Sequence, residues 1–486
     1  MEYLTAVEVR IAEYAKSHTD KVAVISGKKR ITYGELWENI LLAVKVYEEK
    51  FKLSAGSSII LAADKNVEFI YAYFGAHLAG LRVVPLASDT NINRLQFIVD
   101  KLNAQALVGF RNCDLEITQY SWDIFSVRDF EMTAKKVDFP DMDQIADILF
   151  TTGTTGEPKG VPLTFGNLAA AVRNINTFIG NGADDVEVLA LPISHSFGLG
   201  RLRCSLSMGA TICLLGSFAN VKKLFRTMDE EKATIFTMVP ASYRYLKKYT
   251  GNRLGNFAGQ LKYIEMGSAF FAPEEKQELA ELLPDTRICM HYGLTEASRS
   301  AFMEFHADSA QLSSVGKASP FTEIGIFDEN GKKLSVGSEG EICVKGDHVT
   351  KGYLYRDNSD TFFGDYFRTG DWGSMDEDGY VYLKSRKKEL INVGGKKVSP
   401  VEVELELKKI VGIADCACVG VPDPNEVLGE VVKAFLVKDS TVEVDFADIT
   451  RALQGKLEGY KVPVDYEWID EIPRTHNGKI QRLSLK

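Results

Sequence analysis

The chain has 486 residues and a net charge of −10, with 45% hydrophobic and 26% charged residues. This length predicts about two to four domains, and the ordinary composition argues against a disordered or membrane-embedded protein. The negative charge and the lack of a long lysine or arginine run argue against a general nucleic-acid-binding role, because affinity for a duplex rests on clustered cations.

The cysteines and the chain start bear on the cellular compartment. The seven cysteines are scattered and odd in number, which favours reduced thiols over a disulfide framework. Cys416 and Cys418 alternate like one face of a strand and lack metal-ligand spacing. Residues 1–18 are charged throughout and predict an amphipathic helix instead of a signal peptide. No apolar stretch approaches the ~20 residues of a membrane helix. We therefore expect a cytoplasmic protein.

Short β-rich runs alternate with helical patterns through the first three hundred residues. The amino-terminal part predicts strands at 22–25, 58–62 and 82–86 and helices at 33–50 and 66–79. After residue 185, strands are predicted at 186–191, 210–214, 234–239, 261–266 and 286–290. Strands that alternate with helices predict an α/β fold with a mostly parallel sheet.

After about residue 316 the sequence pattern changes from alternating strands and helices to short strands separated by turns. Turn signals at 328–331 and 376–379 separate β-alternating runs, which predicts a small antiparallel β subdomain at about 316–387. From residue 388 the chain has its own βα alternation and is expected to form a separate small domain.

A glycine- and threonine-rich stretch at residues 148–160 follows a short apolar run. Its glycines let backbone N–H groups turn inward, its hydroxyls donate hydrogen bonds and its lysine adds a charge, so the stretch suits a polyphosphate. The spacing differs from that of the usual ATPase loop because Gly160 follows the lysine. A solvated turn is the alternative. A strand at 161–163 and a helix at 167–179 are expected next, with Thr164 as a possible N-cap. The predicted phosphate-binding residues are Thr151, Thr152, Gly153, Thr154, Thr155, Gly156 and Lys159.

Several predicted strands end in polar turns, at 192–195, 267–269 and 291–296. Ligands of open α/β sheets bind beyond the carboxyl ends of the strands. These turns and the phosphate stretch are therefore expected to surround one cleft.

Further stretches carry groups suited to nucleotide chemistry. Thr295-Glu296 offers a hydroxyl and a carboxylate, Asp371 follows Arg-Thr-Gly, Arg386 precedes a cationic run, and Lys479 lies in an Asn-Gly-Lys turn. Each is weak evidence alone. In this order, over more than 300 residues, they resemble the adenylate-forming superfamily of acyl-CoA synthetases, peptide-synthetase adenylation domains and beetle luciferases.

The resemblance implies a large amino-terminal domain of αβ sheets with a β-barrel-like subdomain, residues 1–387, and a mobile α+β domain, residues 388–486. It also implies that a carboxylate attacks ATP to give acyl-AMP and pyrophosphate, and that a thiol then takes the acyl group. ATP, Mg²⁺ and CoA are the implied cofactors and co-substrate.

The resemblance also assigns roles to individual residues. The catalytic residues would be Lys479, Thr295, Glu296 and His195, with Glu296 as the Mg²⁺ ligand. Besides the phosphate stretch, the nucleotide would contact Gly267, Ser268, Ala269, His291, Tyr292, Gly293, Asp371 and Arg386. Lys388 would be the hinge, and Gly394 and Gly395 would line a pantetheine tunnel. The acyl pocket would include Phe197, Val239, Met266 and Met290.

The acid and the acceptor stay open at this point. Residues 191–199 contain His195 and no carboxylate to pair an ammonium, which favours an acid without an α-amino group. Arg201 could meet a second polar group of the acid or form an ordinary ion pair. The acceptor could be CoA or a phosphopantetheine carrier protein, either of which could use the basic aromatic segment 243–253. A non-catalytic nucleotide-binding protein and a γ-phosphoryl transferase are the alternatives from other classes.

Overall fold

The computed structural model describes residues 4–111, 113–126, 138–152, 158–216, 218–394, 396–425, 427–439, 442, 444–474 and 480–485. The chain forms two compact units. The first comprises Met1–Leu312, Gly316–Glu323 and Val344–Asp365, and the second Ser313–Val315, Ile324–Cys343 and Tyr366–Lys486. The movable domain expected from residue 388 onward stays a prediction and is taken up below.

The first unit contains a nine-stranded sheet in the order β15-β14-β13-β12-β11-β9-β10-β1-β2. Its strands are β1 (Val22–Ser26), β2 (Lys29–Thr32), β9 (Val186–Leu189), β10 (Thr211–Leu214), β11 (Ile235–Met238), β12 (Tyr263–Met266), β13 (Arg287–Tyr292), β14 (Ala301–Glu304) and β15 (Lys317–Ala318). The run from β13 to β1 is parallel, whereas β2, β14 and β15 pair antiparallel. The predicted mostly parallel sheet is confirmed.

A second, six-stranded sheet has the order β6-β5-β3-β4-β7-β8. Its strands are β3 (Ser58–Ala62), β4 (Arg82–Leu86), β5 (Ala106–Val108), β6 (Gln119–Tyr120), β7 (Ile145–Thr152) and β8 (Pro158–Thr164). Only β8 runs antiparallel to its neighbour, so β7 and β8 form a hairpin at the sheet edge. This hairpin carries the predicted phosphate stretch.

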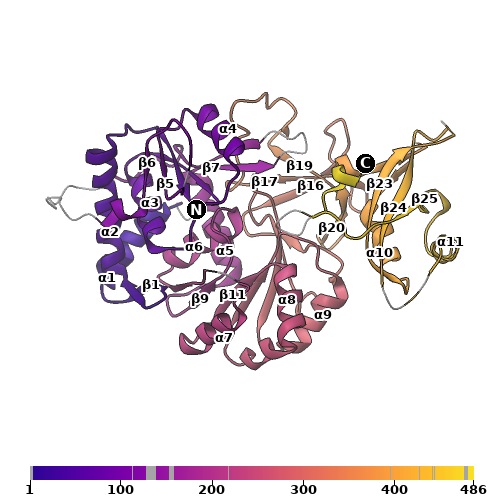
Figure 1. Ribbon diagram of the computed structural model, residues 1–486, viewed down its shortest axis with the longest axis horizontal. Helices are drawn as coiled ribbons and strands as arrows, with labels where there is room; N and C mark the ends of the chain where they lie inside the picture. The colour runs from indigo at the N-terminus through magenta and orange to yellow at the C-terminus, as the bar shows by residue number, and fades with distance from the viewer. Residues whose placement is uncertain are drawn as a thin grey trace. The chain divides into compact units, whose positions relative to one another are not determined.

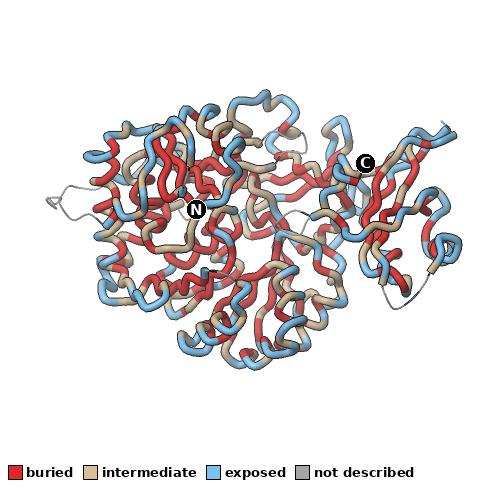
Figure 2. The backbone as a smooth tube through the Cα atoms, in the orientation of Figure 1, coloured by how far each residue is buried: buried red, intermediate tan, exposed pale blue. Residues whose placement is uncertain are grey.

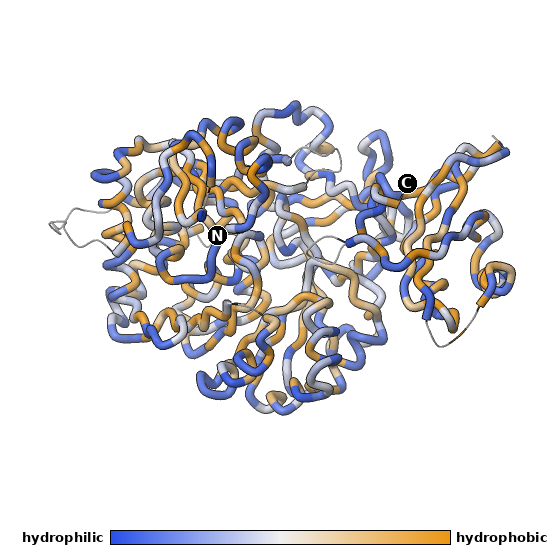
Figure 3. Tube along the Cα trace, viewed as in Figure 1, coloured by the Kyte–Doolittle hydropathy of each residue, from blue (hydrophilic) through white to orange (hydrophobic). Residues whose placement is uncertain are grey.

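Helices cover both faces of each sheet. One core is shared by the two sheets and buries α1 (Val7–Ser17), α2 (Tyr33–Lys45), α3 (Val67–Leu78), α5 (Phe165–Ile179) and α6 (Ser196–Ser207). The outer face of the nine-stranded sheet packs against α7 (Val221–Glu230), α8 (Pro240–Thr250) and α9 (Pro273–Leu282), as Figure 1 shows. The outer face of the six-stranded sheet packs against α4 (Ile92–Leu102). Figure 2 and Figure 3 show that the buried strands are mostly hydrophobic and the outer loops hydrophilic.

Local sequence explains where several helices begin and end. The Thr164 hydroxyl accepts a hydrogen bond from the Asn167 N–H, and the Asn167 side chain returns one to the Thr164 N–H, so the predicted N-cap is confirmed. Gly180, at φ 73°, ends α5 in the left-handed conformation that glycine adopts readily. The predicted helix at 33–50 is α2 followed by a π-helical turn, η1 (Val46–Phe51).

The second unit begins with a sheet that contains β16 (Glu323–Phe327), β17 (Glu339–Lys345), β19 (Tyr366–Met375) and β20 (Val381–Arg386), in which β20 pairs antiparallel with β19. Asp376 and Gly379, at φ 84°, form the predicted turn between the last two strands. The C-terminal part contains β21 (Ile391–Val393), β22 (Lys396–Val398), β23 (Ile413–Pro422), β24 (Glu430–Lys438), β25 (Asp465–Trp468), α10 (Pro400–Leu407) and α11 (Phe446–Gln454). The α+β character predicted for this part is confirmed.

All seven cysteines are free thiols, and six of them are buried. In the part of the chain that the structure describes, no helix is long and apolar enough to cross a bilayer.

Candidate active site

The β7–β8 hairpin places the two ends of the predicted phosphate stretch side by side. Thr151 pairs with Lys159 across the hairpin. Lys159 also lines a cavity of about 150 Å³ together with Lys101 and Arg356, so cations gather at this end of the hairpin. Gly153, Thr154, Thr155 and Gly156 lie outside the described residues, as does the side chain of Thr152.

Tyr353 connects this hairpin to the loop after β13. Its hydroxyl donates to Oε1 of Glu296 over 2.8 Å, and its ring centroid lies 5.0 Å from the Nζ of Lys159. Nearby, Thr350 donates its N–H to the Glu296 carbonyl oxygen and its hydroxyl to the Pro162 carbonyl oxygen. Lys159, which is predicted to bind phosphate, and Glu296, which is predicted to bind the metal ion, therefore contact the same tyrosine. Tyr353 could not be predicted as a site residue, because no local sequence pattern marks it.

Glu296 suits a magnesium ion that ATP shares. Its residue is 7% exposed, and one carboxylate oxygen holds Tyr353. The described residues contain no group of three or more metal-ligating side chains, so a site built by protein groups alone is not formed there. Magnesium is commonly held by one or two carboxylates plus substrate phosphates. A single buried carboxylate beside the hairpin that is predicted to bind phosphate fits that pattern.

The turn after β12 is tightly packed against the end of β13. A Cβ atom added at Gly267 would lie 2.2 Å from Cε1 of His291, so no side chain fits there. Ser268 follows at φ 73°, a left-handed conformation that non-glycine residues adopt rarely and that is common at functional sites. Two of the predicted nucleotide turns thus meet at the carboxyl ends of neighbouring parallel strands, as expected.

His195 occupies the N-cap position of α6, and its residue is exposed. Two residues later, the Phe197 ring packs edge-on against the His291 ring, with the centroids 4.5 Å apart. The start of α6 therefore joins the turns after β12 and β13. This places the predicted catalytic histidine at the same edge of the nine-stranded sheet.

The four predicted acyl-pocket residues lie on two different faces of that sheet. Phe197 belongs to the core shared by the two sheets, and Val239 packs against it. Met266 belongs to the core under α7, α8 and α9, and Met290 packs against that core. The structure does not bring the four side chains into one group, and the acyl-pocket assignment stays a prediction.

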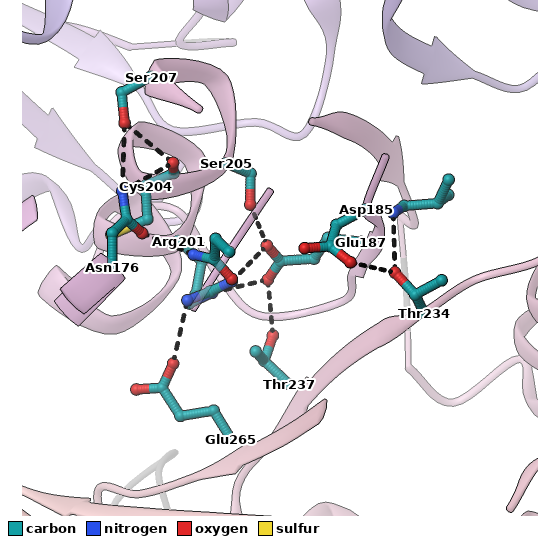
Figure 4. Close-up of polar contacts among 12 residues, drawn as sticks. Asn176, Asp185, Glu187, Arg201, Cys204, Ser205, Ser207, Thr234, Thr237 and Glu265 are labelled. Atoms are coloured by element: carbon teal, nitrogen blue, oxygen red, sulfur yellow. Dashed lines mark hydrogen bonds and ion pairs between the residues drawn. The ribbon is translucent and has the colours of Figure 1, made fainter. Parts of the chain in front are cut away.

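Arg201 is part of a buried charge cluster (Figure 4). It is 0% exposed and pairs with both carboxylate oxygens of Glu187 over 2.9 Å, while its third nitrogen lies 3.4 Å from Glu265. The hydroxyls of Ser205 and Thr237 also donate to Glu187. The ion-pair interpretation of Arg201 is confirmed, although the pair is buried between α6 and the strands instead of lying at the surface.

Arg299 extends this cluster to the edge of the sheet. Its Nε lies 3.1 Å from Glu265, and its other nitrogens donate to the backbone carbonyls of Ser196 and Phe197, each over 2.9 Å. A buried arginine with three fixed acceptors holds its neighbours in place. The cluster thus fixes the start of α6, next to His195, against β12.

A second buried cluster ties α1 to β7. Nδ1 of His77 lies 2.6 Å from Glu8 and Nε2 lies 3.1 Å from Asp147, which also accepts hydrogen bonds from Tyr73 and Arg203. Burial lowers the pKa of His77, but the hydrogen bonds and charges of the two carboxylates outweigh burial and raise it to about 9. His77 is therefore an imidazolium in the neutral range.

Asp371 and Arg386 face each other across β19 and β20 in the second unit. The Arg386 Nε lies 2.9 Å from Asp371, whose residue is 2% exposed. The placement of Arg386 beside Asp371 agrees with the sequence analysis, and the ribose-binding role stays a prediction.

The remaining predicted residues lie farther along the second unit. Lys388 sits in a short 3₁₀ turn directly after β20, and Gly394, at φ 57°, donates its N–H to the Leu428 carbonyl oxygen. Gly395 and Lys479 lie outside the described residues.

The basic segment 243–253 forms ion pairs between two helices. Arg244 pairs with Glu275 and Lys247 with Glu278, at distances of 2.6 Å, so α8 and α9 neutralise each other there. These two cations behave as an ordinary helix surface.

Comparisons with known proteins agree with this arrangement. A family profile described as AMP-binding enzyme matches residues 11–354, and one for the AMP-binding enzyme C-terminal domain matches residues 402–479. The chain is 28% identical to 2-succinylbenzoate–CoA ligase of Bacillus licheniformis, over 98% of both chains.

Two solved structures show the same fold. One is the o-succinylbenzoate CoA synthetase of Bacillus subtilis with its acyl-adenylate intermediate, at a TM-score of 0.89 and 25% identity over 98% of this chain and 97% of that one. The other is ATP-bound MatB of Rhodopseudomonas palustris, at 0.89 and 27% identity over 99% and 98%. The Bacillus subtilis synthetase is also known with ATP and a magnesium ion. The chain belongs to the AMP-binding enzyme family, within the adenylate-forming superfamily that its motifs predicted.

Proposed function

We propose that this enzyme is an AMP-forming acid–thiol ligase that activates a carboxylic acid with ATP and transfers the acyl group to CoA. The observation that carries the proposal is the contact of Tyr353 with both Lys159 and Glu296, because it gathers a phosphate-binding cation and a magnesium-binding carboxylate. The full-length similarity to a CoA ligase supports the second step.

In the first step, a carboxylate oxygen of the acid bonds to the α-phosphorus of ATP, the bond from this phosphorus to the bridging oxygen breaks, and pyrophosphate leaves. Lys159 and the phosphate stretch hold the departing phosphates, and Thr295 contacts the α-phosphate. Glu296 binds Mg²⁺, which neutralises charge as two anions approach. His195 lies beside the carboxylate and the α-phosphate.

In the second step, the thiol loses its proton to solvent, its sulfur bonds to the acyl carbon, and AMP leaves with the electron pair of the broken carbon–oxygen bond. Residues 388–486 rotate about Lys388 between the steps. The rotation removes Lys479 from the adenylation site and brings in Gly394 and Gly395 to line the pantetheine path. Asp371 binds the ribose hydroxyls throughout.

CoA is the proposed acceptor, in preference to a carrier protein. Relatives that match almost the whole chain are CoA ligases, which supports this choice. No nucleic acid takes part. The seven free cysteines suit the cytoplasm, where thiols stay reduced.

Pyrophosphate release, coupled to trapping of acyl-AMP by hydroxylamine, tests the proposal across fatty, aryl, dicarboxylic and amino acids, each with and without CoA. We expect one non-amino acid to respond and a CoA thioester to form. Lys479→Ala should lose the first step and still convert supplied acyl-AMP to thioester, because the lysine acts only during adenylation.

Other outcomes would contradict parts of the proposal. ADP as product would indicate a γ-phosphoryl transferase. Adenylation without transfer to CoA would favour a carrier protein, and ATP binding without turnover of any acid would favour a non-catalytic nucleotide-binding protein.

A further inference from the structure

His291 is held from three sides at the end of β13. Its side chain is 8% exposed, and its Nδ1 lies 2.7 Å from Oε1 of Glu265, close but not aligned as a linear hydrogen bond. The Phe197 ring packs edge-on against it, and its ring fills the space in which a side chain at Gly267 would lie. The imidazole therefore has a fixed position and orientation.

The neighbours of His291 decide which nitrogen carries its proton. Burial raises the pKa of Glu265, but Arg299, His291 and Arg201 outweigh it and hold that pKa at about 2. An ionised carboxylate can only accept a hydrogen bond, so Nδ1 of His291 carries the proton that faces it.

A second proton on the ring is disfavoured. Burial lowers the pKa of His291, and the charges of Arg299 and Arg201 lower it further against the opposing effect of Glu265. The cluster contains two arginines, Arg201 and Arg299, and two glutamates, Glu187 and Glu265, so its charges already cancel without a charged imidazole. A neutral imidazole protonated on Nδ1 carries a lone pair on Nε2.

Among the residues that the structure describes, none uses this lone pair. Nε2 of His291 contacts no donor among the residues that the structure describes, and it is not among the fully buried atoms. It is an accessible acceptor beside Phe197 and Gly267, where α6 and the turn after β12 meet.

We infer that Nε2 of His291 accepts a hydrogen bond from the acid substrate, which therefore carries a hydroxyl or amide N–H group in the part that enters this site. The inference rests on the proposed function and narrows its substrate class. A plain hydrocarbon chain would cover this acceptor and leave it unpaired. An ionised second carboxylate offers no donor and repels the lone pair. A donor could also come from ATP, whose adenine carries an amino group. Loss of a hydrogen bond from the acid changes the preference among acids, whereas loss of one from adenine raises the KM for ATP.

The test uses matched acids that differ only in one substituent. The kcat/KM for pyrophosphate release is measured with hydroxyl, methoxy and unsubstituted members of a cinnamate and a butyrate series, and with succinate. We expect the hydroxyl member of one series to exceed its partners by about tenfold or more. His291→Leu should lower the kcat/KM for the hydroxyl member to that of its partners, and His291→Gln, whose amide oxygen can accept, should restore part of the preference.

His306→Leu is the matched control. His306 is an exposed histidine of the same unit, and its Nε2 lies within hydrogen-bonding distance of the backbone carbonyl oxygens of Leu283 and Thr286. Its loss should lower the melting temperature without changing the preference among acids. If His291→Leu fails to fold, His291→Gln carries the test, because its preference should lie below that of the wild type.

Several results would overturn the inference. Equal rates within every series, a preference for succinate, or a preference that survives in His291→Leu would each show that His291 does not read the acid. A raised KM for ATP in His291→Leu, with the acid preference intact, would assign the hydrogen bond to the adenine amino group. In all these cases acids are still adenylated and the proposed function stands. Folded enzyme that adenylates no acid would overturn both.

Discussion

Removing the hydroxyl of Tyr353 tests whether this residue positions Glu296. Tyr353→Phe keeps the ring beside Lys159 and deletes only the 2.8 Å hydrogen bond to the carboxylate. A hydrogen bond to a charged group contributes about 1.5–3 kcal/mol. Because Tyr353 is only half-buried, we expect the lower part of this range, about 1.5–2 kcal/mol. The rate of adenylation should fall by about 10- to 30-fold, since 1.4 kcal/mol corresponds to a factor of ten.

The assay is pyrophosphate release as a function of magnesium concentration. A misplaced Glu296 should raise the magnesium concentration needed for half-maximal rate, and saturating magnesium should recover part of the loss. The matched control is Tyr382→Phe, which removes a 2.9 Å hydrogen bond to Asp376 in the turn between β19 and β20. The control should keep the magnesium requirement of the wild type. An unchanged rate and magnesium requirement in Tyr353→Phe would refute the positioning role.

Three further changes have defined outcomes. Arg201→Leu leaves the buried charge of Glu187 uncompensated, so urea unfolding should show a loss of about 3–5 kcal/mol, while a changed acid preference in the surviving enzyme would revive a substrate contact. Against the effect of burial, the carboxylates of Glu8 and Asp147 raise the pKa of folded His77 from the ordinary 6.5 to about 9, so its stabilisation is complete below pH 6.5 and lost as the pH rises through 9. Unfolding free energies measured across this range should fall, and His77→Gln should flatten the slope. Lys159→Ala should weaken ATP binding in calorimetry by about tenfold or more, with Lys159→Arg closer to the wild type.

Much of the fold could be predicted from local sequence. The strands expected at 58–62 and 82–86 coincide with β3 and β4, because each is a continuous apolar run between turn residues. Thr164 could be recognised as an N-cap because its hydroxyl precedes a helical pattern. The polar turns that follow the predicted strands could also be placed at one edge of the sheet, because the carboxyl ends of parallel strands lie on the same side.

Contacts between distant segments could not be predicted in this way. Tyr353 and Glu296 are 57 residues apart, and the sequence around neither indicates the other. The partner of Arg201 lies on β9, where Glu187 reads as the exposed residue of an alternating strand but is fully buried. Met266 follows Glu265 directly, so the two side chains lie on opposite faces of β12. Because this strand is buried on both faces, its sequence does not indicate which face lies toward the site.

The contact between Glu8 and His77 makes the first helix a structural part of the nucleotide-binding half of the enzyme. A chain shortened to begin after Ser17 would keep the imidazolium but lose one of its two carboxylates in a core closed to water. His77 and Arg203 would then share one carboxylate, Asp147 on β7, the strand that leads into the phosphate stretch. Deletion of the first helix should therefore impair ATP use from a distance.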